Sequence, residues 1–97
     1  MTDTARETIL ALSRQAHDLT EASYQAHAAV KGDPVWPEKQ RVLLADMALH
    51  LLQTALREGE IDTARLQSNL YSILTICAPF LPEKELARYA DAVIQPR

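Results

Sequence analysis

Small and apolar residues recur at alternating steps of four and three along the first third of the chain, where neither proline nor glycine interrupts residues 4–31. An average step of 3.5 residues keeps one narrow stripe on one side of a helix, the pattern of coiled coils and antiparallel bundles. We therefore expect a long helix over 4–31 that ends at Lys31-Gly32 and faces a partner helix, in the same chain or in a second copy. The stripe consists of Ala5, Ile9, Leu12, Ala16, Leu19, Ser23, Ala26 and Val30.

Residues 37–57 predict a second helix. When its residues are plotted at 100° each around the helix axis, the apolar side chains cover about two thirds of the circumference. Its polar positions form one stripe of Asp46, His50, Gln53 and Arg57. A helix of this kind requires neighbours on several sides, so we expect it to be the central element. The apolar positions are Leu43, Leu44, Ala45, Met47, Ala48, Leu49, Leu51, Leu52, Ala55 and Leu56.

Two shorter helices follow, over 62–77 and 82–94. Asp62 is suited to cap the first of them, and Pro82 to occupy the first turn of the second. The four segments predict an all-α fold, a compact bundle in a single domain over residues 1–97. Because the first helix is longer than its partners, we expect a second copy to cover it as a homodimer, with a seam made of Ile9, Leu12, Ala16, Leu19 and Ala26.

Composition supports a folded domain and excludes several classes of partner. Hydrophobic residues make up 47% of the chain and charged residues 24%, close to globular averages. The net charge of -3 leaves no basic patch, so nucleic acid is not an expected partner. No stretch approaches the roughly 20 apolar residues of a membrane span, and Asp3 and Glu7 stand where a signal peptide is basic. With Cys77 as the single cysteine, we expect a cytoplasmic protein without a disulfide.

Histidine and carboxylate residues recur at helical spacing. His17 and Glu21 are four residues apart, as are Asp46 and His50, and each pair can point two ligands at one metal ion. Both pairs lie on polar flanks, so we expect ordinary surface hydrogen bonding, no metal and no cofactor. The alternative is a metal or small-ligand site that also includes His27, formed if the two flanks face each other.

A mixed polar and aromatic stripe follows one flank of the first helix, where Ser13, Thr20 and His27 run beside His17 and Tyr24. Such a stripe suits recognition of a partner helix, although a solvated flank is the simpler interpretation. Trp36 is expected in the loop between two prolines. We expect it to pack over the next helix as a hydrophobic staple, with an anchor for a partner as the alternative.

The sequence gives little support for nucleophilic catalysis. Cys77 lies in an apolar arc, where a thiol is usually a buried hydrophobe, and Ser13 with His17 lacks a third orienting group. The two glycines form no phosphate loop, and no motif is specific enough to indicate a family. We therefore expect a non-enzymatic protein-interaction module of the adaptor, inhibitor or regulator type, with an unidentified protein partner, and a metal-binding or ligand-binding bundle as the alternative.

Overall fold

The computed structural model describes residues 1–95, and these form four α-helices in sequence without a strand. They are α1 (Asp3–Ala26), α2 (Trp36–Leu56), α3 (Thr63–Cys77) and α4 (Leu86–Ile94). Two short 3-10 turns, Ala78–Phe80 and Pro82–Lys84, lie between α3 and α4. The all-α prediction is confirmed, and so are the number and order of the helices.

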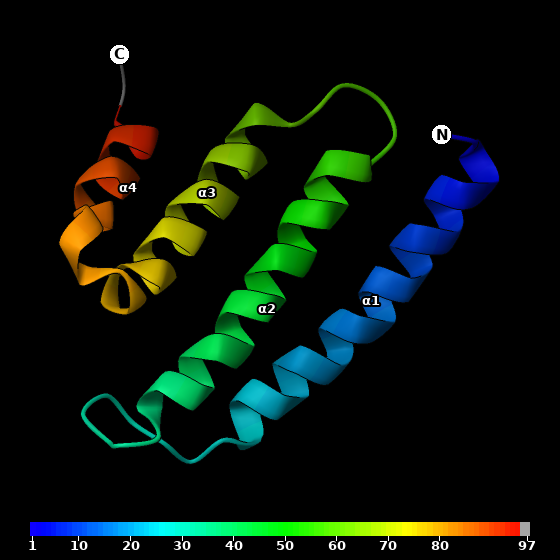
Figure 1. Ribbon diagram of the computed structural model, residues 1–97. Helices are drawn as coiled ribbons and strands as arrows, with labels where there is room; N and C mark the ends of the chain where they lie inside the picture. The colour runs from blue at the N-terminus through cyan, green and yellow to red at the C-terminus, as the bar shows by residue number, and fades with distance from the viewer. Residues whose placement is uncertain (96–97) are drawn as a thin grey trace.

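The helices form an open layer, with α1 packed on α2, α2 on α3 and α3 on α4 (Figure 1). The molecule measures 44 × 38 × 18 Å, and its radius of gyration is 15.1 Å. A compact chain of this length has a radius of gyration of about 12.5 Å. The predicted compact bundle is therefore wrong, because no pair of helices closes over the others. The central position of α2, between α1 and α3, agrees with the prediction.

The caps explain where two of the helices begin. The hydroxyl of Thr2 accepts a hydrogen bond of 3.1 Å from the Ala5 amide at the start of α1. Asp62, the predicted cap of α3, accepts one of 3.1 Å from the Arg65 amide. Each contact satisfies an amide that has no partner within its helix, so these residues determine where the helices start.

Helix α1 ends at Ala26, five residues before the predicted end. Residue His27 is extended, its ring Nδ1 accepts from the Ala29 amide at 3.2 Å, and Ala29 is buried. Gly32, expected to follow the helix, instead occupies a turn at φ +100°, in which the Asp33 amide donates to the Val30 carbonyl. Glycine adopts this positive φ readily because it has no Cβ, and here the conformation forms a β-turn and not a helix cap.

Helix α4 begins at Leu86, four residues after the predicted start. Pro82 belongs to a separate 3-10 turn, and Glu85 then adopts the left-handed conformation at φ 53° and ψ 41°. It is the only non-glycine residue with positive φ among residues 1–95. A left-handed residue breaks the regular helix, which is why Pro82–Lys84 and α4 are separate elements.

The core of the layer is small. Among the described residues, only Ala29, Ile76 and Ala90 are buried hydrophobic residues, and no large side chain is fully buried. Three polar residues, Ser13, Asp46 and Thr54, are buried as deeply. Within residues 1–95, no helix combines the length and the hydropathy that crossing a lipid bilayer requires.

Replacing Glu85 by glycine should stabilise the protein. The left-handed conformation costs a residue with a Cβ about 1–2 kcal/mol, while glycine adds about 0.5–1 kcal/mol of unfolded-state entropy. The exposed ion pair with Arg88, at 3.7 Å, contributes little. We expect Glu85→Gly to raise the free energy of unfolding by about 0.5–1 kcal/mol in chemical denaturation. Glu83→Gly, within the preceding 3-10 turn, should lower it, and a loss in both variants would contradict the interpretation.

Candidate functional site

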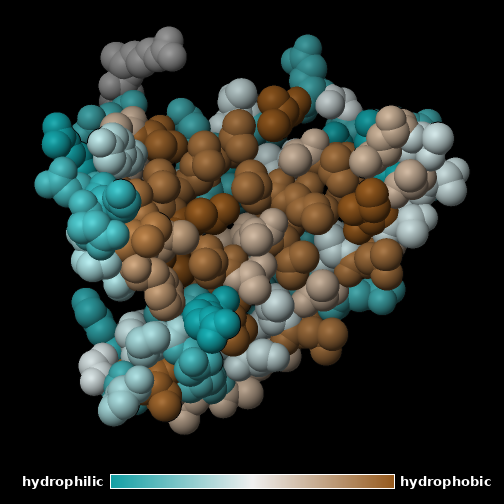
Figure 2. Space-filling view, viewed as in Figure 1, coloured by the Kyte–Doolittle hydropathy of each residue, from teal (hydrophilic) through white to brown (hydrophobic). Residues whose placement is uncertain are grey.

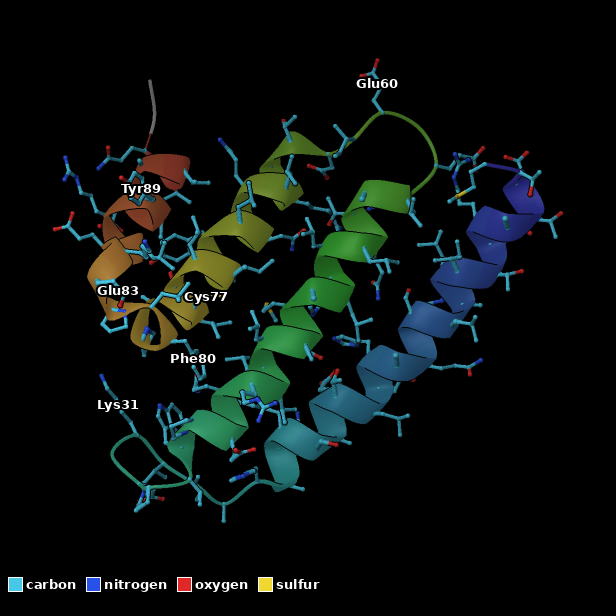
Figure 3. All side chains as sticks on the ribbon, in the orientation of Figure 1. Lys31, Glu60, Cys77, Phe80, Glu83 and Tyr89 are labelled. Atoms are coloured by element: carbon cyan, nitrogen blue, oxygen red, sulfur yellow. The ribbon has the colours of Figure 1, made fainter. Side chains whose placement is uncertain are left out.

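Helices α1 and α2 face each other with their polar sides. His17 and Thr20 from α1 contact Asp46 and His50 from α2, and the side chains of both helices fill the space between the ribbons (Figure 3). Spacings of three and four residues place His17 and Thr20 on one face of α1, and Asp46 and His50 on one face of α2. The flanks expected to carry surface hydrogen bonds therefore form the contact between the two helices.

Asp46 is the most deeply buried carboxylate at this contact, with 6% of its surface exposed. Thr20 Oγ1 donates to Asp46 Oδ1 at 2.6 Å. His17 Nε2 lies 3.3 Å from Oδ1, and His50 Nε2 lies 3.4 Å from Oδ2. A buried carboxylate is costly unless donors or cations surround it, so the fold depends on these neighbours.

The two histidine rings meet directly. Their Nε2 atoms are 2.9 Å apart, and the rings are nearly perpendicular, at 79°. The other ring nitrogen of His17, Nδ1, lies 3.7 Å from a carboxylate oxygen of Glu21. His17, Asp46 and His50 thus form one cluster, in which a ligand atom from each residue lies within 4.8 Å of the others. We call this group the His–Asp–His cluster.

A polar groove of about 460 Å³ adjoins the cluster, because His50 is also part of its wall. Arginines from three segments line it: Arg14 on α1, Arg57 after α2 and Arg65 on α3. On its floor, Thr54 Oγ1 donates to Asn69 Oδ1 at 2.6 Å and links α2 to α3. Asp62 also lines the groove and pairs with Arg65 at 3.3 Å, so the excess positive charge comes from Arg14 and Arg57, next to His50.

The remaining candidate residues lie near the loop that joins α1 to α2. Lys39 Nζ is 3.3 Å from the Ala29 carbonyl, 4.7 Å from the ring centre of Tyr24 and 5.9 Å from that of Trp36. Trp36 is half-buried and is the first residue of α2, not a loop residue. This group stabilises the connection between the helices through cation–π contacts.

The structure thus divides the predicted recognition stripe into two parts. His17 and Thr20 join the His–Asp–His cluster, whereas Tyr24, His27 and Trp36 lie around the loop. Ser13 is buried and donates to the Leu10 carbonyl of its own helix. Sequence reasoning missed Lys39, Thr54 and Asn69, since nothing in their spacing distinguishes them from ordinary surface positions.

Part of the apolar stripe of α1 is left exposed. Leu12 is 58% exposed and Leu19 is 71% exposed, while Ile9 and Ala16 are half-buried and Ala26 is exposed. Both helices contribute to a shallow groove on this side, which is lined by the apolar Leu19, Val42 and Ala45 and by the polar Thr20, Ser23, Glu38 and Arg41. No helix of the described chain covers this side.

The comparisons with protein-family models, with curated proteins and with solved structures find no match to this chain. The features that bear on function are therefore those of the chain itself. They are the His–Asp–His cluster, the arginine-lined groove beside it and the apolar side of α1 and α2.

Thr20 should be essential for the stability of the α1–α2 contact. Thr20→Val keeps the shape of the side chain and removes the donor to Asp46, so it should cost about 1.5–3 kcal/mol of unfolding free energy. Thr20→Ser retains the hydroxyl and should lose much less. Urea denaturation of the three proteins measures both effects, and a valine variant as stable as the wild type would contradict the role given to this bond.

Proposed function

We propose that this protein is a non-enzymatic interaction module that binds through the apolar side of α1 and α2, and that its partner there is a second copy of the chain. Figure 2 shows broad apolar colouring across one face of the molecule, over α2 and the helices on either side of it. The exposed side chains include Leu12 and Leu19 on α1. On α2 the exposed residues include three alanines, Ala45, Ala48 and Ala55.

The observation that carries the proposal is the excess of accessible surface. The chain exposes 7063 Å². A compact monomer of 10.8 kDa exposes about 5,500 Å², which leaves about 1,500 Å² in excess. A stable protein interface takes about 800 Å² from each partner. The open layer therefore has enough surplus surface to form an interface of ordinary size.

The chemistry of this side favours a helical partner. Alanines allow two helix backbones to approach closely, and the protruding leucines, Leu12 and Leu19, can fit between residues of a facing helix. Glu38 and Arg41 line the groove on this side and pair with each other at 3.6 Å, so their opposite charges offset each other.

A second copy is the simplest partner because a two-fold axis matches the apolar side with itself. Two-fold dimers are the commonest oligomers, and self-complementary surfaces are what such an axis requires. Of the predicted seam, Leu12, Leu19 and Ala26 are exposed, whereas Ile9 and Ala16 are half-buried. We propose these five residues as the contact between the copies, with the three exposed ones at its centre. The proposal places the protein in the cytoplasm, where a single unpaired cysteine such as Cys77 is stable.

Light scattering coupled to gel filtration tests the assembly. At micromolar concentration we expect twice the chain mass of 10.8 kDa. Leu19→Glu and Ala26→Glu place a charge in the contact and should shift the protein to the monomer. Gln25→Glu, on an exposed position about 120° around α1 from Leu19, is the matched control and should remain dimeric. A wild-type monomer at every concentration would contradict the second copy as partner, and dimeric Glu variants would contradict the placement of the seam.

A further inference from the structure

We propose that His17, Asp46 and His50 bind a divalent transition-metal ion of the Zn²⁺ class between α1 and α2. The proposal concerns the interior of the helix pair and is independent of the apolar side. It rests on the geometry of the three residues, on the chemistry of their atoms and on the side chains that hold them.

The distances match those around a metal ion. A tetrahedral Zn²⁺ with bonds of about 2.0–2.1 Å holds its ligand atoms about 3.3–3.4 Å from one another. In the His–Asp–His cluster the separations are 2.9 Å between the two Nε2 atoms, and 3.3 and 3.4 Å from these nitrogens to the Asp46 oxygens. The nearest oxygen is Oδ1 for His17 and Oδ2 for His50, and one ligand atom from each residue lies within 4.8 Å of the others. One ion can therefore reach all three side chains after small rotations of these side chains.

The atoms are also suited to a positive charge between them. Two imidazole nitrogens and a carboxylate meet in one small region, and Asp46 is almost fully buried. A single proton on one Nε2 satisfies only one of the three close contacts, whereas a divalent ion satisfies all of them. Imidazole and carboxylate together suit Zn²⁺ and similar ions, while Ca²⁺ and Mg²⁺ prefer oxygen alone.

Two further side chains are placed as the outer partners of metal ligands usually are. Thr20 donates to Asp46 Oδ1 at 2.6 Å and holds the carboxylate in position. Glu21 lies 3.7 Å from Nδ1 of His17, on the opposite side of the ring from Nε2. When Nε2 binds a metal, Nδ1 carries the proton, and a nearby carboxylate orients the ring by attracting it.

The cluster provides three ligands, so a fourth position is left for solvent. Structural zinc sites usually have four protein ligands, whereas sites with three keep a position for water or an anion. His50 is partly exposed and lines the polar groove, which gives the ion a route from solvent. A water molecule or a small anion attracted by Arg14 can complete the coordination from that side.

The chain offers a matched test because it contains three histidines, of which two are in the cluster. Titration calorimetry of the untagged full chain with ZnCl₂ should give one ion per chain. His17→Ala, His50→Ala and Asp46→Asn should each weaken binding more than tenfold, because loss of an outer-shell partner alone typically costs about 10–100-fold. His27→Ala should bind as the wild type does, because His27 contacts only the loop after α1.

Two further measurements keep the test decisive if a variant folds poorly. The wild type should bind Co²⁺ with the visible absorption of a tetrahedral or five-coordinate site. Zn²⁺ at a hundredfold excess over its Kd should raise the Tm by about 10 °C or more. Leu19→Glu, which removes the proposed dimer contact, should still bind Zn²⁺. No binding by the wild type, or equal losses in His27→Ala and His50→Ala, would overturn the proposal whatever the oligomeric state.

Discussion

The burial of the Asp46 carboxylate between α1 and α2 determines how the rest of the molecule is arranged. A carboxylate in that position needs donors, and α1 supplies them from Thr20 and His17 on one face. Once this face is directed at α2, the leucines on another face of α1 cannot also point there. The orientation of α1 about its own axis therefore has two results. It places polar side chains in the contact with α2, and it leaves apolar side chains on the outside.

The helices could be predicted from the sequence because their signals are local. Periodicity identifies a helix, and Asp62 caps α3 as its position before the apolar run indicates. The ends are less predictable where tertiary contacts intervene. Ala29 is buried beside the start of α2 and Lys39 binds its carbonyl, so the chain leaves the helix before Gly32. Likewise, nothing in the residue type of Glu85 indicates a left-handed conformation.

The candidate site was only partly predictable. The i, i+4 spacing selected His17 with Glu21 and Asp46 with His50, but spacing within a helix does not show which helix lies opposite. An apolar stripe is normally the buried one, which favours packing α1 through Leu12 and Leu19. The evidence against this packing lies in two polar stripes, one on α1 and one on α2, whose hydrogen-bonding groups complement each other. Such a match involves residues about 30 positions apart and becomes visible only when both helices are considered together.

The serial packing of the helices has a consequence for how the chain folds. Each helix packs mainly on its neighbours in the sequence, so most tertiary contacts close short loops. Proteins with such low contact order fold in microseconds to milliseconds, well ahead of those dominated by distant pairings. The chain thus resembles a short array in which one hairpin of helices can form before the next is complete, and helical structure can spread from any adjacent pair.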